Sequence, residues 1–147
     1  MTDARRVPAA WAAWSFALLL GSTAAAPTPK PTGNLAPGTY RQIDTVTKKP
    51  LVPGNQIVVV AAKGGRLAFS LNAVRQTDAG LGFVVGLIPA TLPVTWTQDA
   101  AAGKCRLTFD PVPRGLRIVQ DAAYGDCGFG SAINASGTYL PAPENAP

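Results

Sequence analysis

The sequence contains no histidine, and this absence limits the chemistry open to the protein. Histidine is the usual general base near neutral pH, the commonest metal ligand and the usual partner of a catalytic serine or cysteine. Neither a zinc-ligand cluster nor a calcium-loop pattern is present. We therefore expect no enzymatic activity, no bound metal and no cofactor.

Acidic residues are also scarce, and a carboxylate pair brought together by folding is the catalytic alternative that stays open, since glycoside hydrolysis needs two such groups. Beyond residue 26 the acidic residues are Asp44, Asp78, Asp99, Asp110, Asp121, Asp126 and Glu144. Nearly all fall at expected strand ends or in loops, where aspartate stabilises turns. We therefore favour a structural role for these acidic residues over a catalytic one.

Charged residues make up only 14% of the chain, with a formal net charge of +5. Removing Asp3, Arg5 and Arg6 with a leader removes +1 and leaves +4. The remaining positive charge is scattered, and Lys48 and Lys49 form its one adjacent basic pair. Scattered charge is typical of a solvated surface and permits attraction to a protein or to an anionic envelope component. We expect no nucleic-acid partner.

The first 26 residues have the three parts of a signal peptide. Arg5 and Arg6 supply the positive start, residues 11–20 are apolar, and residues 21–26 are small. An uncleaved anchor is the alternative, because residues 7–26 are nearly long enough to span a bilayer. The small-residue end and Pro8 favour cleavage. The mature protein is then periplasmic or secreted, without stable membrane insertion.

Three segments should follow the leader. Residues 27–37 are rich in proline and predict an extended spacer. Residues 38–140 predict one folded domain, and residues 141–147 a flexible tail.

Within the domain the apolar residues alternate with period two. Leu67, Phe69 and Leu71 alternate with polar or small residues, as do Cys105, Leu107 and Phe109. This alternation describes a strand with one buried face. Residues 56–62 and 81–88 are more uniformly apolar, which is expected of central strands or of strands covered on both sides. The expected strands are 39–43, 56–62, 66–71, 81–88, 94–98, 104–110, 116–120 and 132–135, the last running on towards 139.

Turn residues separate these strands, and no helical apolar stripe occurs. Gly64 and Gly65 supply the positive φ of a hairpin turn, and residues 111–115 predict a second hairpin. The pattern predicts an all-β fold, an antiparallel meander of about eight strands in a small barrel or sandwich. Gly-Thr-Tyr occurs at 38–40 and again at 137–139, as expected if the first and last strands pair to close a barrel.

Cys105 and Cys127 are the only cysteines, and an exported chain meets an oxidising compartment. Their spacing does not resemble a redox-active C-x-x-C pair. We predict a structural disulfide between them.

Four residues are candidates for contact with a partner. Arg114 and Arg117 flank the tip of the second hairpin and should project into solvent, and Tyr124 lies in the following loop. Phe129 lies between two glycines beside the disulfide, where packing is the favoured interpretation and partner contact the alternative. Trp96 is expected in the core.

The last third of the chain carries four motifs. They are Cys105-Arg-Leu-Thr-Phe109, Leu116-Arg-Ile-Val-Gln120, Asp126-Cys-Gly-Phe-Gly130 and Ala135-Ser-Gly-Thr-Tyr139. Their layout resembles that of small exported bacterial β-proteins of the cell envelope, a resemblance that implies export and supplies no catalytic residues. A looser similarity is to the periplasmic c-type lysozyme inhibitors, which are disulfide-bonded β-barrels that insert a loop serine and a lysine into the lysozyme cleft. The related segments here are 136–139, one residue short of the inhibitor motif, and 47–49.

These observations predict a non-enzymatic envelope protein that binds a partner through its loops. The alternative is an inhibitor or immunity protein against a cell-wall-cleaving enzyme.

Overall fold

A computed structural model describes residues 30–52, 54–74, 81–100, 103–130 and 133–143. The predicted signal peptide and the acidic residues Asp78 and Glu144 lie outside these residues. In the described part of the chain, no helix has the length and hydropathy needed to cross a bilayer.

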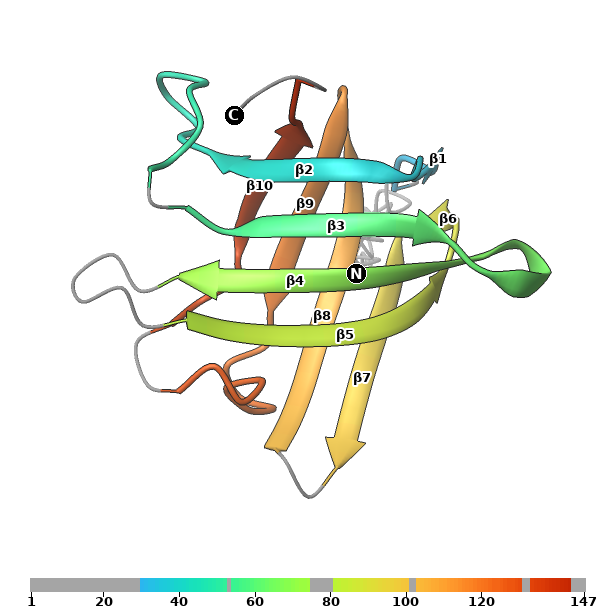
Figure 1. Ribbon diagram of the computed structural model, residues 1–147, viewed down its shortest axis with the longest axis vertical. Helices are drawn as coiled ribbons and strands as arrows, with labels where there is room; N and C mark the ends of the chain where they lie inside the picture. The colour runs from blue at the N-terminus through green and yellow to red at the C-terminus, as the bar shows by residue number, and fades with distance from the viewer. Residues whose placement is uncertain (1–29, 53, 75–80, 101–102, 131–132, 144–147) are drawn as a thin grey trace, which may run out of the picture.

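Eight strands form one antiparallel sheet that curls into a nearly closed barrel (Figure 1). The first four are β2 (Gly38–Ile43), β3 (Gln56–Ala61), β4 (Arg66–Val74) and β5 (Leu81–Pro89). The last four are β7 (Val94–Ala100), β8 (Gly103–Val112), β9 (Gly115–Gln120) and β10 (Gly137–Pro141). The order β5-β4-β3-β2-β10-β9-β8-β7 joins two four-stranded meanders through β2 and β10. The predicted all-β meander is confirmed, with the first and last strands paired as expected.

The seam of the barrel lies between the edge strands β5 and β7. Trp96 of β7 packs edge-to-face on Phe69, with 5.2 Å between the ring centroids. Gly86 of β5 makes room for this contact, because a Cβ at residue 86 would lie 2.6 Å from atoms of both rings. Side-chain packing therefore closes the barrel where backbone hydrogen bonds do not join the two strands.

The inward positions alternate along every strand and fill the interior with apolar side chains. Those with no more than 1% exposure include Ile57, Val59, Leu71, Ile88, Leu107, Phe109, Leu116, Ile118 and Tyr139. Trp96 is partly buried against this core, close to its predicted place.

The turns follow the predicted chemistry. Gly64 and Gly65 both have φ near 69° in the short 3-10 turn η1 (Lys63–Gly65) that links β3 to β4. The β8–β9 hairpin turns at Pro113 and Arg114, and Arg114 has φ of 65°.

The N-terminal boundary differs from the prediction. Within the expected spacer, β1 (Gly33–Asn34) pairs with β6 (Thr91–Leu92), and the Leu35 amide donates to the Ala90 carbonyl at 2.8 Å. Leu35 is buried because its side chain packs against the core. The packed domain therefore extends towards the N-terminus at least to Gly33 rather than starting at residue 38.

The last strand also begins later than expected, at Gly137 instead of near residue 132. The two backbone amides that directly precede β10 are hydrogen-bonded to side chains. Asn134 Oδ1 accepts from the Ser136 amide at 2.7 Å, and Gln120 Oε1 accepts from the Ala135 amide at 2.9 Å. Because these amides are already satisfied, strand pairing starts after them. At the other end, Ala142 still donates to Thr39, so the order of the chain continues beyond residue 140.

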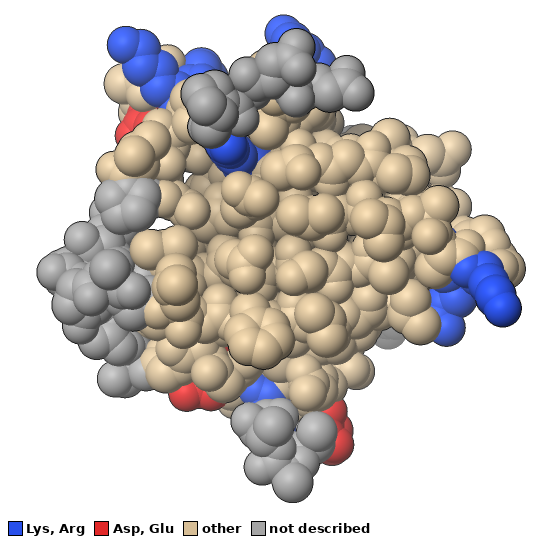
Figure 2. Space-filling view, viewed as in Figure 1, with Lys and Arg blue, Asp and Glu red and all other residues tan. Residues whose placement is uncertain are grey.

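The outer side of β3, β4 and β5 is apolar and open. Leu81, Phe83, Val85 and Leu87 of β5 are all exposed, as is Val60 of β3. Figure 2 shows this side of the molecule as a broad surface with charged side chains towards its margins. The sequence predicts that residues 56–62 and 81–88 form central strands or strands covered on both sides. β3 is central in the sheet, as expected, whereas β5 is an edge strand with an open outer side, so the expectation is wrong for β5.

Candidate functional site

Two adjoining grooves lie where β2 begins and β10 ends. The first has a volume of about 670 Å³ and is lined by residues 36–41, 141–143 and Gln56. The second, of about 550 Å³, is lined by residues 31–36, Leu92 and the 111–115 hairpin turn. Both grooves are lined by Ala36, Tyr40 and Pro141, so they meet around the tyrosine.

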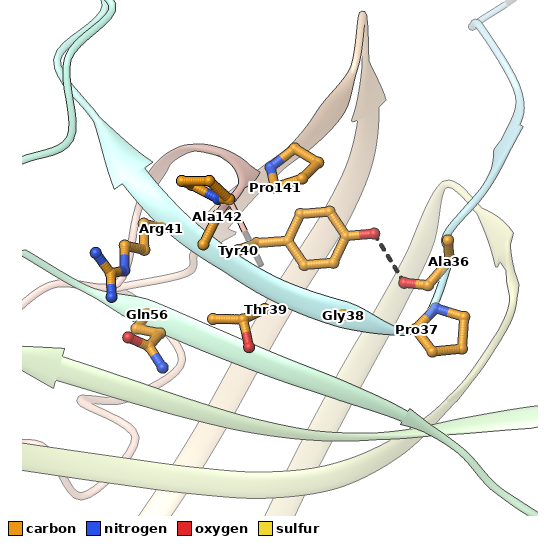
Figure 3. Close-up of a pocket in the computed structure, with 10 residues that line it drawn as sticks. Ala36, Pro37, Gly38, Thr39, Tyr40, Arg41, Gln56, Pro141 and Ala142 are labelled. Atoms are coloured by element: carbon orange, nitrogen blue, oxygen red, sulfur yellow. Dashed lines mark hydrogen bonds between the residues drawn. The ribbon is translucent and has the colours of Figure 1, made fainter. Parts of the chain in front are cut away.

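Tyr40 fixes the shape of this junction. Its ring lies between β2 and the Pro141–Ala142 segment, with the hydroxyl directed at Ala36 (Figure 3). The hydroxyl donates to the Ala36 carbonyl at 2.7 Å. Burial raises the pKa of Tyr40, which keeps the phenol neutral under physiological conditions. The tyrosine thus acts as a donor that holds the N-terminal segment against β2.

A second tyrosine repeats this arrangement on β10. The Tyr139 hydroxyl donates to the Ala135 carbonyl at 2.6 Å, again four residues earlier. The repeat in the sequence is therefore Ala-x-Gly-Thr-Tyr, two residues longer than the predicted Gly-Thr-Tyr. The pairing is symmetric, because Tyr40 lies opposite Pro141 and Tyr139 lies opposite Gln42. The repeated segment marks the two strands that join the meanders.

The charged residues that line the grooves have one sign. Arg41 lines the first groove and Arg114 the second, while the described lining residues include no aspartate or glutamate. Several prolines form much of the remaining wall and stiffen it: Pro31, Pro37, Pro111, Pro113, Pro141 and Pro143. Stiff walls with positive charge suit an anionic ligand bound without large rearrangement.

A buried carboxylate anchors the N-terminal segment beside the grooves. Arg117 donates to Asp110 Oδ2 at 2.9 Å, and the Lys30 ammonium forms an ion pair with Oδ1. Burial opposes ionisation of Asp110, but its hydrogen bonds and ion pairs with Lys30 and Arg117 outweigh this and lower the pKa of the carboxyl. Arg117 is therefore engaged within the fold, although its side chain is half-exposed.

Changing Asp110 to asparagine should lower the free energy of unfolding at neutral pH by about 1–2 kcal/mol, since a charge-assisted contact is lost while both cations regain water. A carboxyl whose pKa is lowered on folding stabilises the fold above its unfolded pKa of about 4, and this contribution disappears as the pH falls through the folded value. Urea denaturation should therefore show that the difference between D110N and the parent chain shrinks below about pH 4.

The matched control is Asp121→Asn, because Asp121 pairs with Arg106 at 3.4 Å on a more exposed surface. Exposed ion pairs contribute little to stability, so this variant should lower the free energy of unfolding by less than about 1 kcal/mol. A difference in the free energy of unfolding between D110N and the parent chain that stays constant from neutral to acid pH would contradict a stabilising role of the ionised Asp110 carboxylate.

The four predicted contact residues do not form one site. Arg114 is exposed at the hairpin turn and lines the second groove. Tyr124 lies towards the opposite end of β8, in the loop whose Gly125 approaches Lys104. There the guanidinium of Arg106 lies 4.1 Å from the centre of the Tyr124 ring. The structure therefore brings Arg114 and Arg117 to one end of the barrel and Tyr124 to the other.

Phe129 belongs to the core, in agreement with the packing interpretation. It is 4% exposed and lies against Gly82, where an added Cβ would come within 2.5 Å of its ring. The predicted disulfide Cys105–Cys127 is formed nearby and ties β8 to the loop that carries Phe129. Phe129 therefore seals this end of the barrel and offers no surface to a partner.

Several aspartates have the expected turn roles. Asp44 Oδ1 accepts from the amides of Val46 and Thr47, and Asp121 and Asp126 each accept from the amide two residues ahead. These backbone hydrogen bonds lower the pKa of Asp44. Among the described residues, no group of three or more histidine, cysteine, aspartate or glutamate side chains is placed to hold a metal ion.

Most of the groove could not be predicted from the sequence. Arg41 and Gln56 lie on adjacent strands in direct register, which no local pattern reveals. The prolines on both sides of Leu35 were a signal that this segment is rigid, but its place on the barrel depends on long-range pairing.

Comparison with known protein families, with characterised proteins and with solved structures finds no match to this chain.

Proposed function

We propose that this chain is an exported, non-enzymatic binding module of the cell envelope. Its binding site is the pair of grooves around Tyr40, and its ligand is an extended anionic polymer or peptide segment. The observation that carries the proposal is the sign of the groove charges, since the charged residues among the described lining are Arg41 and Arg114. The disulfide supports the exported part of the proposal, because such bonds persist in oxidising compartments.

The test uses protein purified after export from cells that express the full chain. Calorimetric titration at low ionic strength should detect binding of an oligoglutamate peptide and none of an oligolysine of equal length. Arg41→Gln and Arg114→Gln should each weaken oligoglutamate binding roughly tenfold, because each removes a charge-assisted contact. Lys104→Gln is the control, since Lys104 is exposed near the opposite end of β8.

Binding that does not distinguish the two peptides, or that survives both arginine changes, would overturn the proposed site. A loss of equal size in Lys104→Gln would show attraction to overall charge instead of binding in the grooves.

A second candidate function is inhibition of a cell-wall-cleaving enzyme. It is favoured by the proximity of the two segments that relate to the lysozyme inhibitors: Gln42 donates to the Ser136 carbonyl at 3.1 Å, and the Asp44 amide donates to the Lys49 carbonyl. Lys48 is exposed in this loop with φ of 60°. A turbidity assay with c-type lysozyme tests this function directly. Undiminished lysis at a large excess of the protein would remove it.

A further inference from the structure

The outer side of β3, β4 and β5, called here the apolar face, has no partner within the described chain. Its centre is formed by eight side chains: Val58, Val60, Ala68, Ser70, Leu81, Phe83, Val85 and Leu87. Leu81 and Phe83 are 76% and 71% exposed. Contiguous exposed apolar surface of this kind marks a contact site, whereas isolated exposed leucines are ordinary.

Two of these strands have sequences suited to burial on both sides. β5 has leucine, phenylalanine, valine and leucine at its outward positions, and β3 has valines. Strands with near-continuous apolar sequences normally lie between two layers. Among the residues that the structure describes, the barrel interior covers the inward side alone, and a layer from another molecule would complete the burial of these strands.

The shape of the apolar face is complementary to itself, because a projecting side chain lies beside a groove. Ala68 and Ser70 are small and form the floor of a groove of about 470 Å³, with Val58 and Val60 along one side and Val85 and Leu87 along the other. Beside this groove the large ring of Phe83 stands at the next outward position of β5 after Val85. The face thus presents a projection next to a depression.

We propose that the apolar face is covered by the same face of a second copy of this chain, in a two-fold symmetric dimer. A two-fold axis lying between two such faces can place Phe83 of each copy over Ala68 and Ser70 of the other. An isologous contact requires this reciprocity, because the same patch must supply both the projection and the depression. This inference is separate from the proposed groove function, which uses a different part of the barrel.

The charges favour a second copy over a charged partner. Among the outward positions of β3–β5, Arg66 is the one charged residue. Its guanidinium donates to the Leu87 carbonyl at 3.2 Å, at one end of the face. A chain that keeps a formal net charge of +4 after removal of the leader can bring two copies together most easily through a surface without like charges.

The size of the face predicts a reversible association. Three strands about 4.8 Å apart and up to nine residues long give a contact of roughly 400–500 Å² on each copy. The two copies together would bury roughly 800–1,000 Å², which is below the standard range for stable complexes, so the dimer should be weak and reversible.

Sedimentation equilibrium of the exported protein, over a wide concentration range, tests the proposal. Phe83→Thr removes the projection and keeps a good strand residue, while Ala68→Lys fills the depression and adds like charge. Each should weaken self-association at least tenfold. Val119→Thr is the matched control, since Val119 is an exposed apolar residue of β9 outside the face, and it should leave the dissociation constant unchanged. Circular dichroism verifies that each variant is folded.

A monomer at every concentration, or a dimer that both variants leave intact, would overturn the proposal. Flotation with vesicles of zwitterionic and of anionic lipid supplies the remaining comparison. A monomer that binds vesicles through Phe83 would assign the face to a membrane surface and also overturn the dimer.

Discussion

Replacing Phe109 by alanine should lower the free energy of unfolding by about 3–5 kcal/mol. Phe109 is fully buried, and its ring lies 5.2 Å from that of Phe69 in an edge-to-face contact. Phe69 belongs to β4 and Phe109 to β8, so this contact joins the two meanders through the barrel interior. Because the packed barrel relaxes only partially around a missing ring, the change leaves a cavity as well as losing apolar burial.

Urea denaturation of dilute protein measures this loss, and Phe83→Ala is its control. Phe83 is the same residue type on the outside of the same sheet, and its truncation should change the free energy of unfolding by about 0.5 kcal/mol or less. Equal losses in the two variants would contradict the assignment of inward and outward faces.

The strand positions could be predicted because the signal is local. In residues 66–71 and 104–110 alternate side chains meet the core and water, which places period two directly in the sequence. The order of the sheet is a long-range property. The repeated Gly-Thr-Tyr nevertheless indicated its central pair, since Tyr40 and Tyr139 lie on adjacent strands and make the same hydrogen bond.

The errors have one physical origin, which is that local patterns do not specify what covers a surface. The apolar sequence of β5 predicted a central strand or one covered on both sides, whereas β5 is an edge strand with an open outer side. Leu35 in the proline-rich segment likewise gave no local signal of burial, because its place depends on pairing with residues more than fifty positions away. Apolar content measures the tendency to be buried, and topology decides where burial occurs.

The candidate contact residues show the same limit. Arg114 was predicted at an exposed turn from Pro and Gly around it, and the structure places it there. Its neighbours in the first groove, Arg41 and Gln56, come from strands far away in the sequence. Turn chemistry could therefore predict exposure at one position, while the composition of the site required the folded barrel.

Replacing both Cys105 and Cys127 by alanine should lower the free energy of unfolding by about 3 kcal/mol. The bond closes a loop with a sequence separation of 22, and its loss restores conformational freedom to the unfolded chain. Both sulfurs are also buried, so two small apolar contacts are lost in addition. Urea denaturation under oxidising conditions measures the change.

The effect should be confined to stability. Cys105 lies near the start of β8, whereas Arg114 lies beyond its end, so the folded double variant should bind the oligoglutamate probe as the parent chain does. A reductant supplies the control: it should lower the stability of the parent chain to near that of the variant and leave the variant unchanged. If the variant were as stable as the oxidised parent, the crosslink would have no part in holding the loop that carries Phe129, and Phe129 would have to seal the barrel through its packing on Gly82 alone.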